Sequence, residues 1–266
     1  MNSLLLTFDL EQFVTPEEKG MNIPRKELFR ISNEGLERIY TLLKETQTKA
    51  TFFTTLEFAK QSLLLKKIVE EGHEIALHGY EHNIHYHEMK SEEALQELKK
   101  AKEELERLFA IKIKGLRTPQ MRTLNFQILK KLGIAYDSSL HPTYIPGYKN
   151  DFFKTRRIKE KEGIKIVPVS VVPLIKAPFS WIWFRNLGLF YVKCCTKLCL
   201  LADDRIHLYF HPWDFADLNK EPFKGRIFPL ILRNSGKKAE NQLKEYILWC
   251  RKKGLKSRTL SDYLRL

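Results

Sequence analysis

Short apolar runs alternate with longer amphipathic segments along almost the whole of this 266-residue chain. The runs have the length and composition of buried strands, whereas the longer segments repeat their apolar residues with helical spacing. We expect strands at 4–9, 49–55, 75–77, 111–116, 134–136, 164–172 and 206–210, helices at 34–49, 56–71, 91–108, 124–132 and 239–253, and a loop over 14–33.

This alternation predicts a parallel sheet whose strands are joined by right-handed crossovers. Seven such units in a chain of this length predict an α/β protein with a distorted (β/α)7-type barrel. Neither a linker nor a repeat divides the sequence, so residues 1–266 are expected to form a single domain.

The four cysteines are too few for a disulfide framework in a chain this long. Cys194, Cys195 and Cys199 are close enough for a thiolate cluster, but they lack a Cys-x-x-Cys spacing. A buried helix face is the better interpretation. The first residues lack the basic region of a signal peptide, so a cytoplasmic location is expected.

Titratable side chains recur where the predicted strands end. Asp9, His78, Arg117, Asp137 and His211 each end or directly follow a different strand. In a β/α barrel the carboxyl ends of the strands converge on one mouth, where active sites lie. Their placement therefore predicts an active site assembled from five strands.

Five of the eight histidines fall between positions 73 and 87. His78 and His82 follow a strand directly, and imidazole is a preferred ligand of zinc and similar metals. A His-rich surface loop would give the same pattern. His85 and His87 are expected at the mouth or surface, and His73 at the opposite end of its strand, in a structural role.

Five short motifs occur in order along the chain. They are Thr7-Phe8-Asp9-Leu10-Glu11, His78-Gly79-Tyr80-Glu81-His82, Arg117-Thr118-Pro119, Asp137-Ser138-Ser139 and Leu208-Tyr209-Phe210-His211. Together they resemble the motifs of NodB-type polysaccharide deacetylases, carbohydrate esterase family 4. The Asp-x-Glu of the first motif and the His-Pro-Trp-Asp around the fifth resemble one branch of that family. The resemblance implies a metal-dependent deacetylase on a barrel of about seven strands.

The resemblance also implies catalytic roles. Asp9 would be the general base, and Arg117 would orient it and keep it ionised. His211 would protonate the departing amine while Asp137 holds its imidazole. Two structural alternatives stay open, because Arg117 could form an ion pair that closes the barrel and Asp137 could cap a helix.

Metal binding is implied for Glu11, His78 and His82, with zinc as the first expectation and cobalt or nickel as alternatives. Leu10 stands where the family's usual first motif has a metal-binding Asp, so Glu11 is the nearest replacement. Gly79 and Gln120 are further departures from the usual motifs. The residues expected to contact substrate are Pro119, Leu208, Trp213 and Gln120, whose backbone N–H would stabilise the oxyanion.

Residues 143–203 are expected to form a basic, aromatic insertion in the barrel. Between 143 and 200, eleven Lys and Arg face three Asp and Glu, a net charge of +8 within a chain of formal charge +14. Such a segment suits peripheral association with an anionic membrane on its inner face. The alternative is a loop and helix that cover the barrel. Nucleic acid is not an expected partner, because no recognition motif accompanies the charge.

The expected function is hydrolysis of an N-acetyl group on an amino sugar of a polysaccharide or a lipid-linked glycan precursor. The same fold also serves metal-independent amidohydrolases, so an allantoinase-like enzyme or a formamido-sugar deformylase is an alternative. A barrel that binds glycan without catalysis is a third.

Overall fold

The computed structural model describes residues 2–146, 149–219 and 223–266. Its strands are β1 (Ser3–Leu10), β2 (Ala50–Thr54), β3 (Glu74–Leu77), β4 (Gly115–Leu116), β5 (Tyr136–Asp137), β6 (Tyr144–Ile145), β7 (Lys149–Asn150), β8 (Lys159–Lys161), β9 (Ile164–Ile166), β10 (Arg205–Phe210) and β11 (Lys256–Ser257).

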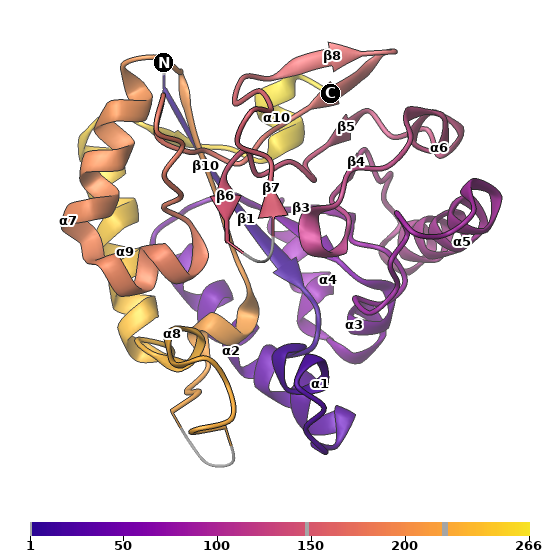
Figure 1. Cartoon of the computed structure of the whole chain (residues 1–266), viewed down its shortest axis with the longest axis horizontal. Helices are drawn as coiled ribbons and strands as arrows, with labels where there is room; N and C mark the ends of the chain where they lie inside the picture. The colour runs from indigo at the N-terminus through magenta and orange to yellow at the C-terminus, as the bar shows by residue number, and fades with distance from the viewer. Residues whose placement is uncertain (1, 147–148, 220–222) are drawn as a thin grey trace.

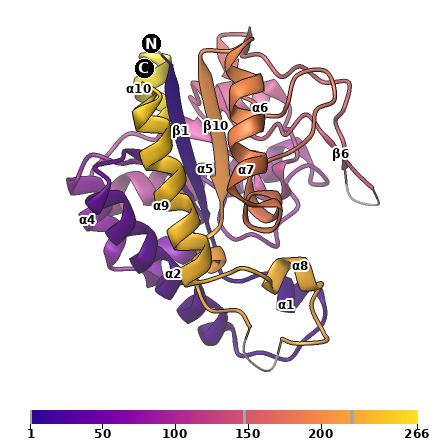
Figure 2. The ribbon, with the colours of Figure 1, turned by 90° about the vertical axis from the view of Figure 1, so that its left-hand side faces the viewer.

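Helices surround the sheet (Figures 1 and 2). They are α1 (Thr15–Glu18), α2 (Arg25–Glu45), α3 (Leu56–Gln61), α4 (Leu64–Glu70), α5 (Ser91–Phe109), α6 (Phe126–Lys131), α7 (Trp181–Leu200), α8 (Pro229–Leu232), α9 (Lys237–Lys252) and α10 (Leu260–Leu264), with the 3₁₀ helices η1 (Pro119–Met121) and η2 (Pro212–Phe215). Among the described residues, no helix is both long and apolar enough to cross a membrane.

The sheet forms a curled half-barrel within a single domain, which confirms the predicted fold class. Parallel strands follow in the order β10-β1-β2-β3-β4-β5-β9, and β8 runs antiparallel to β9 at one edge. The described strands do not close the ladder between β9 and β10. Instead, the Ser170 backbone N–H donates to the His207 carbonyl at 2.9 Å, which joins the segment after β9 to β10.

Strand β1 places the first motif by its two-residue alternation. Leu6, Phe8 and Leu10 pack into the main hydrophobic core between the sheet and the helices. Asp9 and Glu11 have the opposite parity and line the cavity inside the curled sheet. Leu10 is thus a core residue, and Glu11 is the next side chain that can lie beside Asp9.

Two sequence-based boundaries were wrong. Residues 14–33 are not one loop, because α1 contains Pro16 in its first turn and α2 begins at Arg25, directly after Pro24. Proline suits such helix starts, which makes it a poor loop marker there. The helix expected at 56–71 is two helices, α3 and α4, because Ser62 has an extended backbone.

Helix α2 presses closely on η2, the turn that follows β10. A Cβ atom at Gly35 would lie 1.8 Å from the carbonyl oxygen of Pro212, so only glycine fits at this contact. Since η2 continues directly from His211, this packing fixes the position of the fifth motif.

Helix α7, in the segment expected to be an insertion, packs against β10 and α9 (Figure 2). Cys195 and Cys199 are free and buried, as predicted for an apolar helix face, whereas Cys194 is only partly buried. Cys250, on α9, is also free and buried. Burial raises the pKa of both Cys199 and Cys250 to about 12, so these thiols stay protonated and unreactive.

Candidate active site

A fully buried arginine organises the site. Arg117 follows β4 and donates from Nη1 to Asp9 Oδ1 at 2.6 Å and to Thr7 Oγ1 at 3.0 Å. Its Nη2 donates to Ser138 Oγ at 2.9 Å and to His207 Nε2 at 3.1 Å. These bonds fix the Asp9 carboxylate from a single direction and leave it facing the cavity.

Both histidines of the second motif meet Glu11. His78 Nε2 lies 3.1 Å from Glu11 Oε2, and His82 Nε2 lies 3.4 Å from the same oxygen. His78 Nδ1 donates to the Arg117 carbonyl at 2.6 Å, which leaves its Nε2 as the atom that faces Glu11. Side chains that follow two strands, β1 and β3, therefore converge on one carboxylate oxygen.

The charges of this group are set by burial. Burial lowers the pKa of His78 to about 4 and that of His82 well below its usual value, so both rings are neutral near pH 7. Burial, together with Asp9 and Glu18, raises the pKa of Glu11 well above its usual range. A carboxylate in this position needs either a proton or a neighbouring cation.

The donor set suits a divalent metal ion. Two ligands about 2.1 Å from a tetrahedral zinc ion lie about 3.4 Å apart, close to the separations between Glu11 Oε2 and the two Nε2 atoms. The described residues contain no group of three or more His, Cys, Asp or Glu side chains already arranged to hold a metal ion. The pairwise distances and the donor chemistry nevertheless suit a metal ion, because only small side-chain movements separate these contacts from coordination.

His211 is packed between aromatic rings. The Trp213 indole stacks on its imidazole at 4.3 Å between ring centroids and 10° between planes, and Trp181 meets it edge-on at 4.9 Å. The carboxylate of Asp214 lies beside His211. Its Oδ2 is 3.7 Å from His211 Nδ1 and accepts the His211 backbone N–H at 2.8 Å. Asp137 instead accepts from the Ser139 backbone N–H at 2.8 Å, and its role beside His211 stays a prediction.

Asp214 is itself held by a buried ion pair. Its Oδ1 lies 2.9 Å from Arg185 Nη2, and both side chains are almost completely buried. Burial opposes ionisation of this carboxyl, but Arg185, the neighbouring His211 imidazole and the hydrogen bond from the His211 backbone N–H lower its pKa overall. Helix α7 is thereby connected to the histidine at the end of β10.

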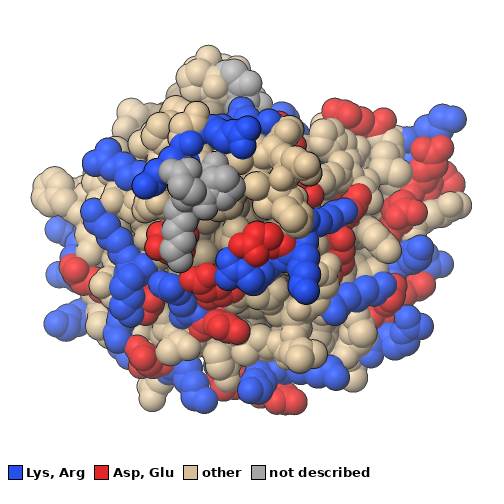
Figure 3. Space-filling view, turned by 90° about the horizontal axis from the view of Figure 1, so that it is seen from below, with Lys and Arg blue, Asp and Glu red and all other residues tan. Residues whose placement is uncertain are grey.

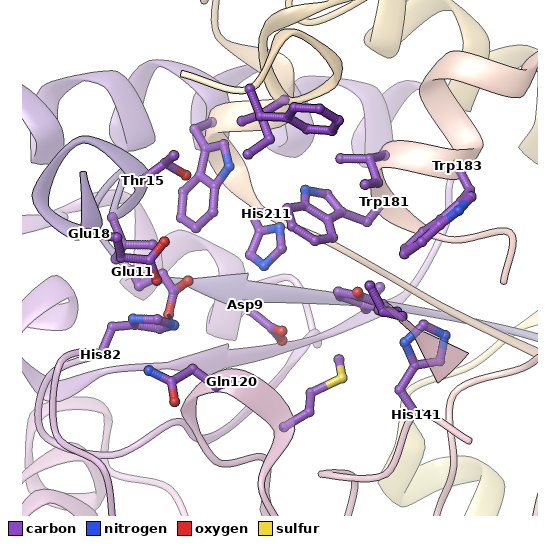
Figure 4. Close-up of a pocket in the computed structure, with 18 of the residues that line it drawn as sticks. Asp9, Glu11, Thr15, Glu18, His82, Gln120, His141, Trp181, Trp183 and His211 are labelled. Atoms are coloured by element: carbon purple, nitrogen blue, oxygen red, sulfur yellow. Dashed lines mark ion pairs between the residues drawn. The ribbon is translucent and has the colours of Figure 1, made fainter. Parts of the chain in front are cut away.

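One cavity of about 510 Å³ joins these groups (Figure 4). Of the residues predicted for the site, those that line it are Asp9, Glu11, His78, His82, Gln120, His211 and Trp213. Arg117, Asp137 and Pro119 are buried and do not line it. Leu208 was predicted to contact substrate, but its side chain lies in the main core on the opposite face of β10. It is a core residue, because side chains alternate between the faces of a strand.

Gln120 lies at the cavity with a left-handed backbone, φ 58°, in the short turn η1. Its side-chain amide contacts His85 Nε2 at 2.8 Å. This places His85 at the mouth, as the sequence predicted.

Sequence reasoning did not assign Asp214, Glu18 or Trp181 to the site. Asp214 stands in the His-Pro-Trp-Asp segment, so the motif itself could have indicated it. Trp181 has a left-handed backbone, φ 51°, which is strained for a bulky residue and positions its ring against His211. No local sequence pattern predicts a left-handed backbone at a tryptophan.

A curled parallel sheet with a carboxylate–arginine pair and a His–Glu–His group at its mouth defines a protein of the β/α-barrel class. The family model for polysaccharide deacetylases matches residues 2–136. The chain therefore belongs to the polysaccharide deacetylase family. Membership supports a deacetylase, an enzyme acting on carbon–nitrogen bonds.

A curated relative carries a name that states no function. The chain is 33% identical over 88 residues to a Bacillus subtilis (strain 168) protein named uncharacterized protein YlxY. The match spans 33% of this chain and 27% of that protein.

Solved structures share the fold at low identity. A probable polysaccharide deacetylase from Pseudomonas aeruginosa PAO1 has a TM-score of 0.65 and 15% identity, over 99% of this chain and 89% of its own. PuuE allantoinase has a TM-score of 0.63 and 16% identity, over 99% and 90%. A mutant, with restored activity, of a CE4 family pseudoenzyme from Bacillus anthracis has a TM-score of 0.56 and 15% identity, over 98% and 66%.

Proposed function

We propose that this protein hydrolyses the N-acetyl group of an amino sugar in a polysaccharide or a lipid-linked glycan precursor. The observation that supports this most directly is that Asp9, held by Arg117, faces the same cavity as His211 and the Glu11–His78–His82 group. A base, an acid and a candidate cation site around one cavity are what amide hydrolysis requires.

Each residue has a defined part in this proposal. Asp9 accepts the proton of the attacking water, and Arg117 holds its carboxylate in place. His211 donates a proton to the departing amine. The backbone N–H of Gln120 contributes to stabilising the oxyanion. The stacked Trp213 and the edge-on Trp181 keep the imidazole oriented and shield it from bulk water.

We further propose that Glu11, His78 and His82 bind a divalent metal, zinc first and cobalt or nickel otherwise. The chemistry supplied by such an ion is polarisation of the amide carbonyl and a lower pKa for water. Neutral imidazoles and a carboxyl with a raised pKa fit this use, because a cation would replace the proton on Glu11.

A metal-independent amidohydrolase is the second candidate. It is favoured by Leu10, which occupies the position of the family's usual metal-binding Asp, and by the direct contact between Glu11 and both histidines. In that case a proton on Glu11 would satisfy the same contacts, and the substrate would be another amide, such as a formamido sugar or a small cyclic ureide.

Metal content separates the two candidates. Protein purified without chelator or affinity metal is analysed for bound elements, beside a His78→Ala/His82→Ala double variant. A His85→Ala/His87→Ala variant is the matched control, because both histidines lie in the same segment outside the Glu11 contacts. We expect near-stoichiometric metal in the wild type and control but not in the first variant. Metal-free protein, even after incubation with zinc, would support the second candidate.

Peripheral association with an anionic membrane, from the cytoplasmic side, remains a separate proposal. Its support is the net charge of residues 143–200. Figure 3 shows Lys and Arg over the face seen from below with Asp and Glu between them, so the charge there is not one uniform patch. Flotation with neutral and with anionic liposomes tests it, and protein that stays unbound in both would refute it.

A further inference from the structure

The active-site cavity has two chemically different sides (Figure 4). Glu11, Glu18 and His82 lie on one side, whereas Trp181, Trp183 and His141 lie on the other. Asp9 and His211 stand between the two sides. A ligand that fills the cavity therefore meets carboxyl groups at one end and mainly aromatic and apolar groups at the other.

The second side is largely aliphatic as well as aromatic. The start of α7 contributes Trp181, Ile182 and Trp183 to the lining. Helix α8, which is hydrogen-bonded to α7, contributes Ile231, with Phe228 directly before it. Ile145 and Pro146 also line the cavity. Indoles can stack on the flat faces of sugars, but branched aliphatic side chains offer neither a flat face nor a hydrogen bond. Ile182 and Ile231 therefore suit hydrocarbon better than a second sugar ring.

This apolar wall is fixed in place and continues to the surface. Asn186 Nδ2 donates to the Leu230 carbonyl at 2.9 Å and Arg185 Nη2 to the Ile231 carbonyl at 3.1 Å, so α8 is held against α7. Phe228, directly before α8, lines the cavity and is 56% exposed. A ligand that covers it would remove apolar surface from water, which is favourable.

We infer that the substrate is an amphiphile whose amino sugar occupies the catalytic side and whose hydrocarbon chain lies along the wall formed by α7 and α8. The position of the amino sugar rests on the proposed function. The position of the hydrocarbon chain rests on the apolar wall alone. One cavity joins both sides, and this continuity favours a lipid-linked sugar over a soluble polysaccharide, since a polar glycan would leave the side chains of Ile182, Phe228 and Ile231 without matching groups.

The test uses methyl, hexyl and octyl glycosides of N-acetylglucosamine below their micelle-forming concentrations. Dissociation constants are measured by tryptophan fluorescence with the full-length protein. In the wild type we expect affinity to rise two- to fourfold per methylene group, since each buried methylene contributes about 0.8 kcal/mol at most. Phe228→Asp should flatten this series, because a charge on the wall opposes a hydrocarbon chain.

Phe153→Asp is the matched control, since Phe153 is 91% exposed and does not line the cavity. Its chain-length series should equal that of the wild type. Ile182→Asp provides a second variant on α7 if Phe228→Asp proves unstable. Equal affinity for methyl and octyl glycosides, or a series that neither wall variant changes, would overturn the inference.

Acetate release from the same glycosides separates this inference from the proposed function. Release without any chain-length effect on binding would leave the deacetylase and refute the lipid-linked substrate. A chain-length effect in a protein that releases no acetate from any acetamido sugar would support the lipid-linked ligand and refute the proposed deacetylase function.

Discussion

Arg117 Nη1 lies 2.6 Å from Asp9 Oδ1, and the two side chains come from different strand ends inside the curled sheet. Arg117 is fully buried and Asp9 nearly so. Such a pair is costly to break, because the remaining partner keeps its charge without water. The same contact therefore supports both the fold and the orientation of Asp9, the proposed base.

Asp9→Asn should separate these two roles. Asparagine keeps the shape and still accepts a hydrogen bond from Arg117, but it cannot take up a proton. We expect kcat to fall about 10²- to 10⁴-fold with little change in KM. Both variants remove the counter-ion of Arg117. Asp9→Ala also removes the hydrogen-bond acceptor, so it should lower the free energy of unfolding further, by about 3–5 kcal/mol relative to the wild type. Kinetics and urea denaturation measure the two effects, and full activity in the Asn variant would remove Asp9 as the base.

Variants of the Asp214–Arg185 ion pair should separate effects on stability from effects on activity. Asp214→Leu alone should lower the free energy of unfolding by about 3–5 kcal/mol, since it leaves Arg185 buried without its partner. The double variant Asp214→Leu/Arg185→Met should recover much of this loss, because two apolar side chains replace a buried ion pair. Activity should stay low in both, since His211 has lost its carboxylate. Recovery of activity together with stability would mean that Asp214 acts only on folding.

His73 predicts a loss of stability in acid. Its Nδ1 accepts the Ala50 backbone N–H at 3.2 Å, and burial lowers its pKa from 6.5 to about 4. The folded protein thus requires the neutral ring, so this contribution is complete above pH 6.5 and is lost as the pH falls towards 4.

The measurement compares unfolding free energies across this pH range in the wild type and His73→Asn. Asparagine can still accept the Ala50 N–H but does not titrate. The wild type should lose more stability than the variant between pH 6.5 and 4. Identical slopes would show that His73 does not contribute.

Gly35→Ala should destabilise the protein although alanine is the better helix former. The new Cβ would lie 1.8 Å from the Pro212 carbonyl, and overpacking of this kind costs about 1–3 kcal/mol. Because Pro212 begins η2 and directly follows His211, a shift of Pro212 should also displace His211 and lower kcat. Thr41→Ala, on the exposed face of α2, is the control and should change stability by about 0.5 kcal/mol at most. Equal stability of the two variants would contradict the contact.

Much of the site could be predicted because it lies at strand ends. Asp9, His78 and His211 line one cavity, and Arg117 binds Asp9, as expected when parallel strands carry polar residues at their carboxyl ends. The two-residue alternation of β1 also accounts for Glu11, rather than Leu10, beside the two histidines.

What could not be predicted depends on contacts between distant segments. Arg185 reaches Asp214 only because α7 packs on the end of β10. The apolar wall requires α8 to lie against α7, through side-chain bonds to backbone carbonyls that have no sequence signature. The start of α2 was missed because Pro24 suggests a turn as readily as a helix start.

Strand β1 pairs with β2, which follows it closely in the sequence, and with β10, which follows about 200 residues later. At a synthesis rate of about 5–20 residues per second, β1 therefore waits about 10 to 40 s on the ribosome before its second neighbour is made. During that time its second edge and its apolar side chains are open to other chains. Asp9 and His211 can meet only at the end of this interval, so translation itself delays assembly of the catalytic centre.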